Sequence, residues 1–127
     1  MFKERIVKRI AWVTGAGKGI GRQLALELAK DGWLVAASAR TDSDLASLVN
    51  DAAGFIGTIS VYPLDVTKEK SVKELIDEIE NNLGKIDLAI LNAGTYIRFG
   101  VAEFTVNLFY RQWNVNVMGT VNCLVHV

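Results

Sequence analysis

The stretch Thr14-Gly15-Ala16-Gly17-Lys18-Gly19-Ile20-Gly21 decides the fold, because it joins an apolar run to an amphipathic one. The run before it, Ile10-Ala11-Trp12-Val13, predicts a buried strand over about residues 9–14. The segment after it predicts a helix over about residues 19–31. The apolar face expected for this helix consists of Ile20, Leu24, Ala25 and Leu28. A helix start offers free N–H groups and partial positive charge, and glycines let a ligand approach the backbone. The stretch therefore predicts a phosphate-binding turn.

The spacing of the glycines narrows this prediction. The pattern is G-x-x-x-G-x-G, on Gly15, Gly19 and Gly21. The pattern G-x-G-x-x-G does not fit, since its last glycine falls on Ile20 or Arg22. A P-loop is excluded as well, because no Gly-Lys-Ser/Thr occurs at the required spacing. A tight turn that binds no ligand remains the alternative.

Composition sets the class of protein. The 127 residues are enough for one domain spanning 1–127, and 50% hydrophobic with 22% charged residues indicates a globular chain. The formal net charge is zero, so we expect neither nucleic acid nor an anionic membrane as partner. The single cysteine, Cys123, excludes an internal disulfide, and the single histidine, His126, has no companion for a metal site. No membrane-length run occurs, and no signal-peptide core follows Lys3-Glu4-Arg5, so we expect a cytoplasmic protein.

Strand-like and helix-like segments alternate along the rest of the chain. Further strands are predicted over about residues 33–39, 58–64 and 86–91. A second helix follows Thr41 and ends near Gly54, and a third begins at Thr67 or at Ser71 and ends at Gly84. Ser71 and Glu74 have the spacing of a capping box in that third helix. After a loop and a helical turn near Glu103, residues from about 109 to 127 are helical by position, although their valines favour a strand. This βαβαβαβα order predicts an α/β, doubly wound parallel sheet of the Rossmann type, with strand order 3-2-1-4.

Four pieces of sequence now resemble the short-chain dehydrogenase/reductase family. They are Thr14-Gly15-x-x-x-Gly19-Ile20-Gly21, Leu64-Asp65-Val66, Asn92-Ala93-Gly94 and Asn116-Val117-Met118-Gly119. Each occupies the family's place in the predicted order of strands and helices. The family usually has a second Asn before Asn92, where this chain has Leu91. The resemblance covers the whole chain but only about the first half of the family's fold.

The resemblance implies an oxidoreductase that transfers hydride to or from a carbonyl or alcohol carbon. The family's chemistry uses a serine and a Tyr-x-x-x-Lys, and neither is found at the family's position within these 127 residues. Four residues past Tyr62, Tyr96 and Tyr110 stand Val66, Gly100 and Asn114. We therefore expect this chain to supply the dinucleotide-binding half, to be inactive alone, and to meet a small substrate only when a C-terminal half is supplied. Asn116 matches the family's fourth catalytic residue, and the alternative is a helix Asn bonded to backbone.

The residues after the second strand bear on the choice of cofactor. Arg40 stands where a carboxylate would bind the ribose 2′-OH of NAD. A guanidinium instead binds a 2′-phosphate with two charge-assisted hydrogen bonds. Lys18 is expected to add a second cation to the same phosphate, and Ser38 or Thr41 a hydroxyl. These residues predict NADP rather than NAD, the alternative being two solvated surface cations.

The other cofactor contacts come from the resemblance. It implies that Asp65 receives the adenine amino group, with Val66 beside the ring. The alternative is that Asp65 caps the helix beginning near Thr67. The resemblance also implies that Asn92, Ala93 and Gly94 support the fourth strand and lie under the adenosine ribose, the alternative being an ordinary Asn-Gly turn.

The apolar edge of the predicted sheet suggests association. The fourth strand, 88–91, would be an apolar edge, and the final helix would have no sheet to cover. We therefore expect a homo-oligomer, a complex with a C-terminal half, or an aggregate. Two other functions stay open: a non-catalytic NADP-binding module, and a structural remnant that binds no ligand.

Overall fold

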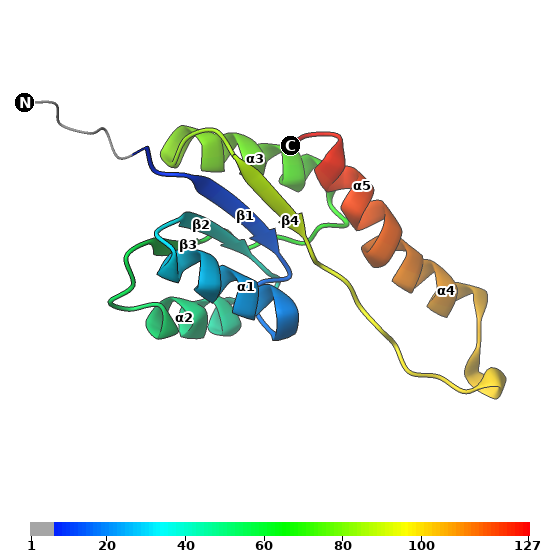
Figure 1. The fold of residues 1–127 in the computed structure, drawn as a ribbon. Helices are drawn as coiled ribbons and strands as arrows, with labels where there is room; N and C mark the ends of the chain where they lie inside the picture. The colour runs from blue at the N-terminus through cyan, green and yellow to red at the C-terminus, as the bar shows by residue number, and fades with distance from the viewer. Residues whose placement is uncertain (1–6) are drawn as a thin grey trace, which may run out of the picture.

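The computed structural model describes residues 7–127, and the charged lead-in expected at residues 1–9 falls mostly outside that range. A four-stranded parallel sheet has the order β3-β2-β1-β4, which confirms the predicted topology (Figure 1). The strands are β1 (Ile10–Thr14), β2 (Leu34–Ser38), β3 (Thr58–Val61) and β4 (Leu88–Leu91). In this register Thr14 lies opposite both Ser38 and Leu91, so three strands end at one level.

Helices cover both faces of the sheet. Figure 1 shows α1 (Gly19–Lys30) and α2 (Asp42–Asp51) on one face, and α3 (Glu69–Asn82) with α5 (Gly119–Leu124) on the other. Successive strand residues alternate between the faces: buried Trp12 packs in the α3–α5 layer and buried Val13 in the α1–α2 layer. Both faces of the strands are therefore apolar, as a sandwiched parallel sheet requires.

The buried face of α1 agrees with the predicted one at Ala25 and Leu28 and differs at Ile20. Ala25 is buried and Leu28 packs against the core, but Ile20 is 74% exposed, and the other buried residues of the helix are Gly21 and Ala29. Gly21 packs so closely on the Gly15 carbonyl that a Cβ at this position would overlap it. That contact fixes the rotation of the helix and turns the preceding residue, Ile20, toward solvent.

The start of α3 also differs from the prediction. The helix begins at Glu69 with Lys68 as its N-cap, so Ser71 lies inside it and the capping box is wrong. The polar turn forms earlier, where the Asp65 carboxylate accepts hydrogen bonds from the Thr67 N–H (3.0 Å) and hydroxyl (2.7 Å). The strand predicted to reach Leu64 ends at Val61, although the N–H groups of Tyr62 and Leu64 still donate to the Ala37 (2.8 Å) and Ala39 (3.0 Å) carbonyls on either side of Pro63.

The last part of the chain is helical, as its position predicted. A short 3₁₀ turn (Val101–Glu103) precedes α4 (Val106–Trp113), and the π-helical segment η2 (Asn114–Met118) joins α4 to α5. The expectation that the final helix has nothing to cover is wrong for α5. Its Asn122 and Cys123 are buried, and Asn122 Nδ2 donates to the Val66 carbonyl (2.9 Å). No residue of α4 is buried, and Figure 1 shows this helix extending beyond the sheet. Within residues 7–127, no helix is long and apolar enough to cross a membrane.

Candidate functional site

A pocket of about 340 Å³ lies at the carboxyl ends of β1, β2 and β4. Ligands of doubly wound sheets bind in this position, where neighbouring crossovers leave a crevice. Most of the predicted site residues line the pocket. These are Gly15, Lys18, Arg40, Thr41, Asp65, Val66, Asn92, Ala93 and Gly94. Gly19, Ile20, Gly21 and Asn116 are not among the lining residues.

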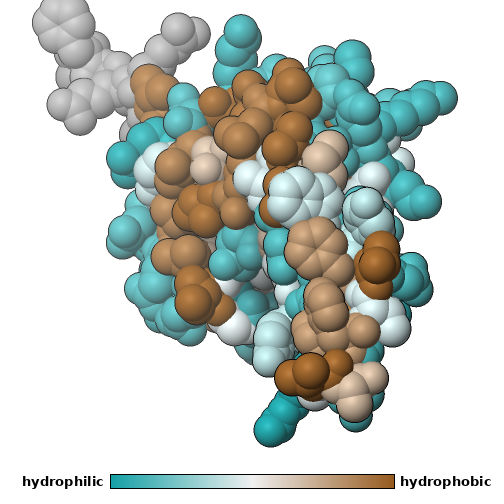
Figure 2. Space-filling view, turned by 90° about the vertical axis from the view of Figure 1, so that its right-hand side faces the viewer, coloured by the Kyte–Doolittle hydropathy of each residue, from teal (hydrophilic) through white to brown (hydrophobic). Residues whose placement is uncertain are grey.

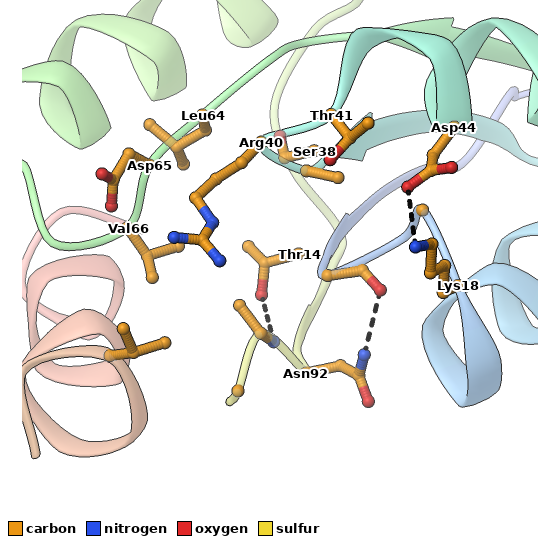
Figure 3. A pocket seen from close by; sticks show the side chains of 16 residues that line it. Thr14, Lys18, Ser38, Arg40, Thr41, Asp44, Leu64, Asp65, Val66 and Asn92 are labelled. Atoms are coloured by element: carbon orange, nitrogen blue, oxygen red, sulfur yellow. Dashed lines mark hydrogen bonds and ion pairs between the residues drawn. The ribbon is translucent and has the colours of Figure 1, made fainter. Parts of the chain in front are cut away.

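The glycine turn is held to the end of β4. Gly15 has a φ of +65°, which disfavours a side chain, and its carbonyl accepts a hydrogen bond from Asn92 Nδ2 (3.2 Å). The backbone N–H of Ala93 donates to Thr14 Oγ1 (3.1 Å), so the first two residues of the turn are tied to the segment 92–94 (Figure 3). Asn92 thus stabilises the conformation of the turn by its hydrogen bond to Gly15, and Gly21 allows α1 to pack closely against the same residue.

The start of α1 is suited to an anion. Its N-cap, Lys18, makes no side-chain capping hydrogen bond, and the first turn contains no acidic residue. Gly19 has a φ of +59°, and a Cβ built there would meet no atom within 4 Å. The first N–H groups of a helix have no acceptor within the helix, and this is the feature that binds pyrophosphate at other helix starts.

Asp65 and Val66 form the opposite wall. Burial of the Asp65 carboxyl opposes its ionisation, but the two hydrogen bonds from Thr67 and the charges of Arg40 and Lys68 outweigh it and lower its pKa. Both bonds from Thr67 go to Oδ1, which leaves Oδ2 as an acceptor for a ligand. Gly119 of α5 packs directly behind the Val66 side chain, so this wall is supported from outside the pocket.

The two predicted phosphate-binding cations do not converge. Figure 3 shows the Arg40 guanidinium turned toward Val66, whereas Lys18 points to Asp44 on the other side of the pocket. Lys18 Nζ lies 3.8 Å from Asp44 Oδ2. Of the two candidate hydroxyls, Ser38 is buried and accepts a hydrogen bond from Trp12 Nε1 (2.9 Å), while Thr41 is exposed. A ligand bound by both cations would require both side chains to turn.

Asn116 has a structural task. Its Oδ1 accepts from the Thr95 N–H (2.6 Å) and its Nδ2 donates to the Thr95 carbonyl (2.8 Å). Four residues earlier, Gln112 Oε1 accepts from the Ile97 N–H (3.2 Å), so one helix face holds the extended segment 95–97. This geometry matches the alternative interpretation of Asn116, in which a helix Asn is hydrogen-bonded to backbone. The backbone groups belong to Thr95, in the loop after β4.

Sequence reasoning missed two residues next to the glycine turn. Asp44 lines the pocket from the first turn of α2. The Arg22 guanidinium donates to the carbonyls of Gly17 (3.4 Å) and Asp44 (3.2 Å) and to Ser47 Oγ (3.1 Å). The available signal was topological: α2 begins directly after β2, so its first turn must lie at the same sheet edge as the glycine turn.

Comparisons with known proteins agree with the fold. The short chain dehydrogenase family profile matches residues 9–127. A short-chain dehydrogenase/reductase of Armillaria gallica is 37% identical over 121 residues, which are 93% of this chain and 46% of the relative. The alcohol dehydrogenase of Thermococcus sibiricus, complexed with 5-hydroxy-NADP, superposes with a TM-score of 0.86 at 28% identity, over 94% of this chain and 52% of that one. ElxO with NADP bound gives the same TM-score at 32% identity, over 94% and 49%.

This chain belongs to the short-chain dehydrogenase/reductase family. It spans about half the length of the curated relatives it matches. Within the described residues 7–127, no cluster of three or more His, Cys, Asp or Glu side chains is arranged to hold a metal ion.

Proposed function

We propose that residues 1–127 form the NADP-binding domain of an oxidoreductase that transfers hydride between the cofactor and a carbonyl or alcohol group. One observation carries the choice of cofactor. Arg40, and not a carboxylate, stands two residues after the end of β2, and it lines the same pocket as Lys18 of the glycine turn. A carboxylate at that place would repel a 2′-phosphate, whereas a guanidinium can bind it in bidentate fashion. The two similar structures described above hold NADP or a derivative of it, which supports the proposal.

In this proposal each segment in or beside the pocket binds one part of the cofactor. The N–H groups at the start of α1 receive the pyrophosphate, and Asp65 Oδ2 accepts from the adenine amino group beside Val66. The ribose lies over the segment 92–94. Arg40 turns away from Val66 to meet the 2′-phosphate with Thr41 and Lys18. The nicotinamide supplies the hydride, and these residues supply binding and orientation.

Titration of the chain with NADPH and NADH, followed by cofactor fluorescence, tests this binding. We expect NADPH to bind at least about tenfold more tightly than NADH. Hydrogen bonds to charged groups contribute about 1.5–3 kcal/mol. Arg40→Ala should therefore weaken NADPH by roughly 10- to 100-fold and NADH by less than about twofold. Lys70→Ala, which removes an exposed cation on α3, serves as the matched control. Equal or tighter binding of NADH would contradict the proposal.

A second measurement separates an oxidoreductase from a non-catalytic NADP-binding module. Loss of NADPH absorbance is followed with a panel of aldehydes and ketones, for this chain alone and for a longer chain where one can be prepared. General acid–base groups contribute about 10²- to 10⁴-fold to rates. We expect negligible turnover by residues 1–127 alone and measurable turnover when the segments that carry such groups are supplied. NADPH binding without turnover in both cases would favour the binding module.

We also propose that the chain associates through the side that carries β4 and α4. Figure 2 faces this side and shows hydrophobic residues gathered over it. The exposed apolar residues of α4, η2 and α5 include Phe109, Tyr110, Trp113, Met118, Val121 and Leu124. Strand β4 pairs only with β1 among the described strands, so its other edge is open. A patch of this kind marks an interaction site. Sedimentation should show a dimer or larger species that Trp113→Glu dissociates, and a monomeric parent chain would refute the association.

A further inference from the structure

A carboxylate lies among the groups proposed to bind the 2′-phosphate. Asp44 lines the same pocket as Arg40 and Thr41, and its Oδ2 is 3.8 Å from Lys18 Nζ (Figure 3). We propose that Asp44 is a specificity-determining residue, which pairs with Lys18 when no phosphate is bound, opposes a 2′-phosphate by its charge, and so limits the preference for NADP over NAD. The inference rests on the proposed function, because it concerns the same pocket.

The position of Asp44 is fixed by its surroundings. Arg22 donates to the Asp44 carbonyl and at the same time to the Gly17 carbonyl, so the first turn of α2 is tied to the glycine turn. A Cβ added to Gly17 would lie 3.1 Å from the Asp44 Cβ, which shows how closely the two segments pack. The Asp44 side chain is only 26% exposed. The carboxylate therefore cannot withdraw far from the pocket when a phosphate enters.

Lys18, by contrast, is free to move. Its side chain is 82% exposed, and an exposed ion pair at this distance is weak. A phosphate dianion offers more negative charge and more acceptor atoms than one carboxylate, so Lys18 is expected to turn from Asp44 to the phosphate. The bound state then leaves the Asp44 charge facing the phosphate without its former partner. Binding of NADP is thereby weakened, while NAD, which carries a hydroxyl at this position, is affected little.

Two other roles for Asp44 give different signatures. If the carboxylate accepted a hydrogen bond from the ribose 2′-OH, its removal would weaken NADH and leave NADPH unchanged. If it acted only as a negative charge near the start of α2, its removal would change both affinities equally through helix stability. Asp42 provides the matched control for this second role, because it lies in the same first turn and does not line the pocket.

The test measures NADPH and NADH affinities for the 127-residue chain, Asp44→Asn and Asp42→Asn at fixed low salt. Removing one like charge near a partly exposed phosphate should tighten NADPH by about 3- to 10-fold. NADH should change by less than about twofold, and Asp42→Asn should change neither cofactor. Unchanged NADPH affinity, an equal change for both cofactors, or weaker NADH binding in Asp44→Asn would overturn the inference alone. If the parent chain bound neither cofactor, the proposed function itself would fail and this inference with it.

Discussion

The glycine turn can be tested by adding one methyl group at Gly21. In Gly21→Ala the new Cβ would lie closer than 3.0 Å to both the Gly15 carbonyl oxygen and Asn92 Nδ2. Real Cβ atoms do not approach other atoms so closely, and one of these neighbours is backbone. The turn must therefore shift, and the Asn92–Gly15 hydrogen bond must lengthen or break.

Three contributions determine how much Gly21→Ala lowers the free energy of unfolding. Overpacking of a closely packed position costs about 1–3 kcal/mol. Loss of the hydrogen bond adds about 0.5–1.5 kcal/mol, and the better helix propensity of alanine returns up to about 1 kcal/mol. We expect a net loss of about 1–3 kcal/mol, which lowers the Tm of a chain of this size by roughly 4–12 °C. NADPH affinity should fall at least about tenfold, because the displaced turn carries the N–H groups that we propose receive the pyrophosphate.

Gly57→Ala is a control with a similar clash elsewhere. A Cβ at Gly57 would overlap the Trp33 and Ala29 carbonyl oxygens, far from the pocket-lining residues. Thermal unfolding by circular dichroism should show that both variants are destabilised. NADPH titration at a temperature where both are folded should show that only Gly21→Ala loses affinity. The reasoning is refuted if Gly21→Ala keeps the parent Tm and affinity, or if Gly57→Ala loses binding to the same extent.

Further predictions concern three other residues, Cys123, Asp65 and Asn116. Burial raises the pKa of Cys123 from 9.0 to about 11, so the native thiol should react with a disulfide reagent near pH 8 at least about 100-fold more slowly than in denaturant. Because the unfolded thiol ionises first, unfolding free energy should also decline more steeply from about pH 9 upward in the parent chain than in Cys123→Ala. The pKa of Asp65 is lowered on folding, so its contribution is present above its usual value of 3.8 and lost as pH falls through the folded pKa. Asp65→Asn should consequently lose less stability than the parent chain on acidification, which urea unfolding at several pH values would measure. Asn116→Ala removes both hydrogen bonds to Thr95, so the Thr95 amide should exchange about tenfold faster or more, whereas exposed Asn114→Ala should leave it unchanged.

The topology was predictable because its signals are local. Each strand is a short apolar run, each helix has a periodic face, and the turn before Gly19 contains the glycines that a sharp strand-to-helix connection needs. The rotation of α1 was not predictable from these signals. Ile20 is apolar and correctly spaced for the buried face, yet the close packing of Gly21 on Gly15 determines which residues face the sheet. That contact is between two glycines, and the spacing of apolar residues does not indicate it.

In the candidate site, too, one part was predictable from the sequence and another was not. Which residues line the pocket was largely predictable, since parallel strands bring their carboxyl ends to one edge. The directions of the cationic side chains were not. Lys18 forms an ion pair with Asp44, which lies 26 residues later in the sequence. The Arg40 side chain lies on the side of the pocket formed by Asp65 and Val66. These orientations are set by charges that meet only in the folded chain.

The open edge of β4 and the pocket are physically connected. The segment 92–94, which is hydrogen-bonded to the start of the glycine turn, continues directly from β4, and β4 is hydrogen-bonded only to β1 among the described strands. Anything that covers the free edge of β4 would restrict this strand and, through Asn92 and Ala93, the glycine turn. Ordering the turn before the cofactor arrives raises its affinity, since less freedom is then lost on binding. Linkage makes this coupling reciprocal, so the cofactor strengthens association by the same factor by which association strengthens cofactor binding. The apolar side of the molecule and its dinucleotide pocket are therefore expected to act as one thermodynamic unit.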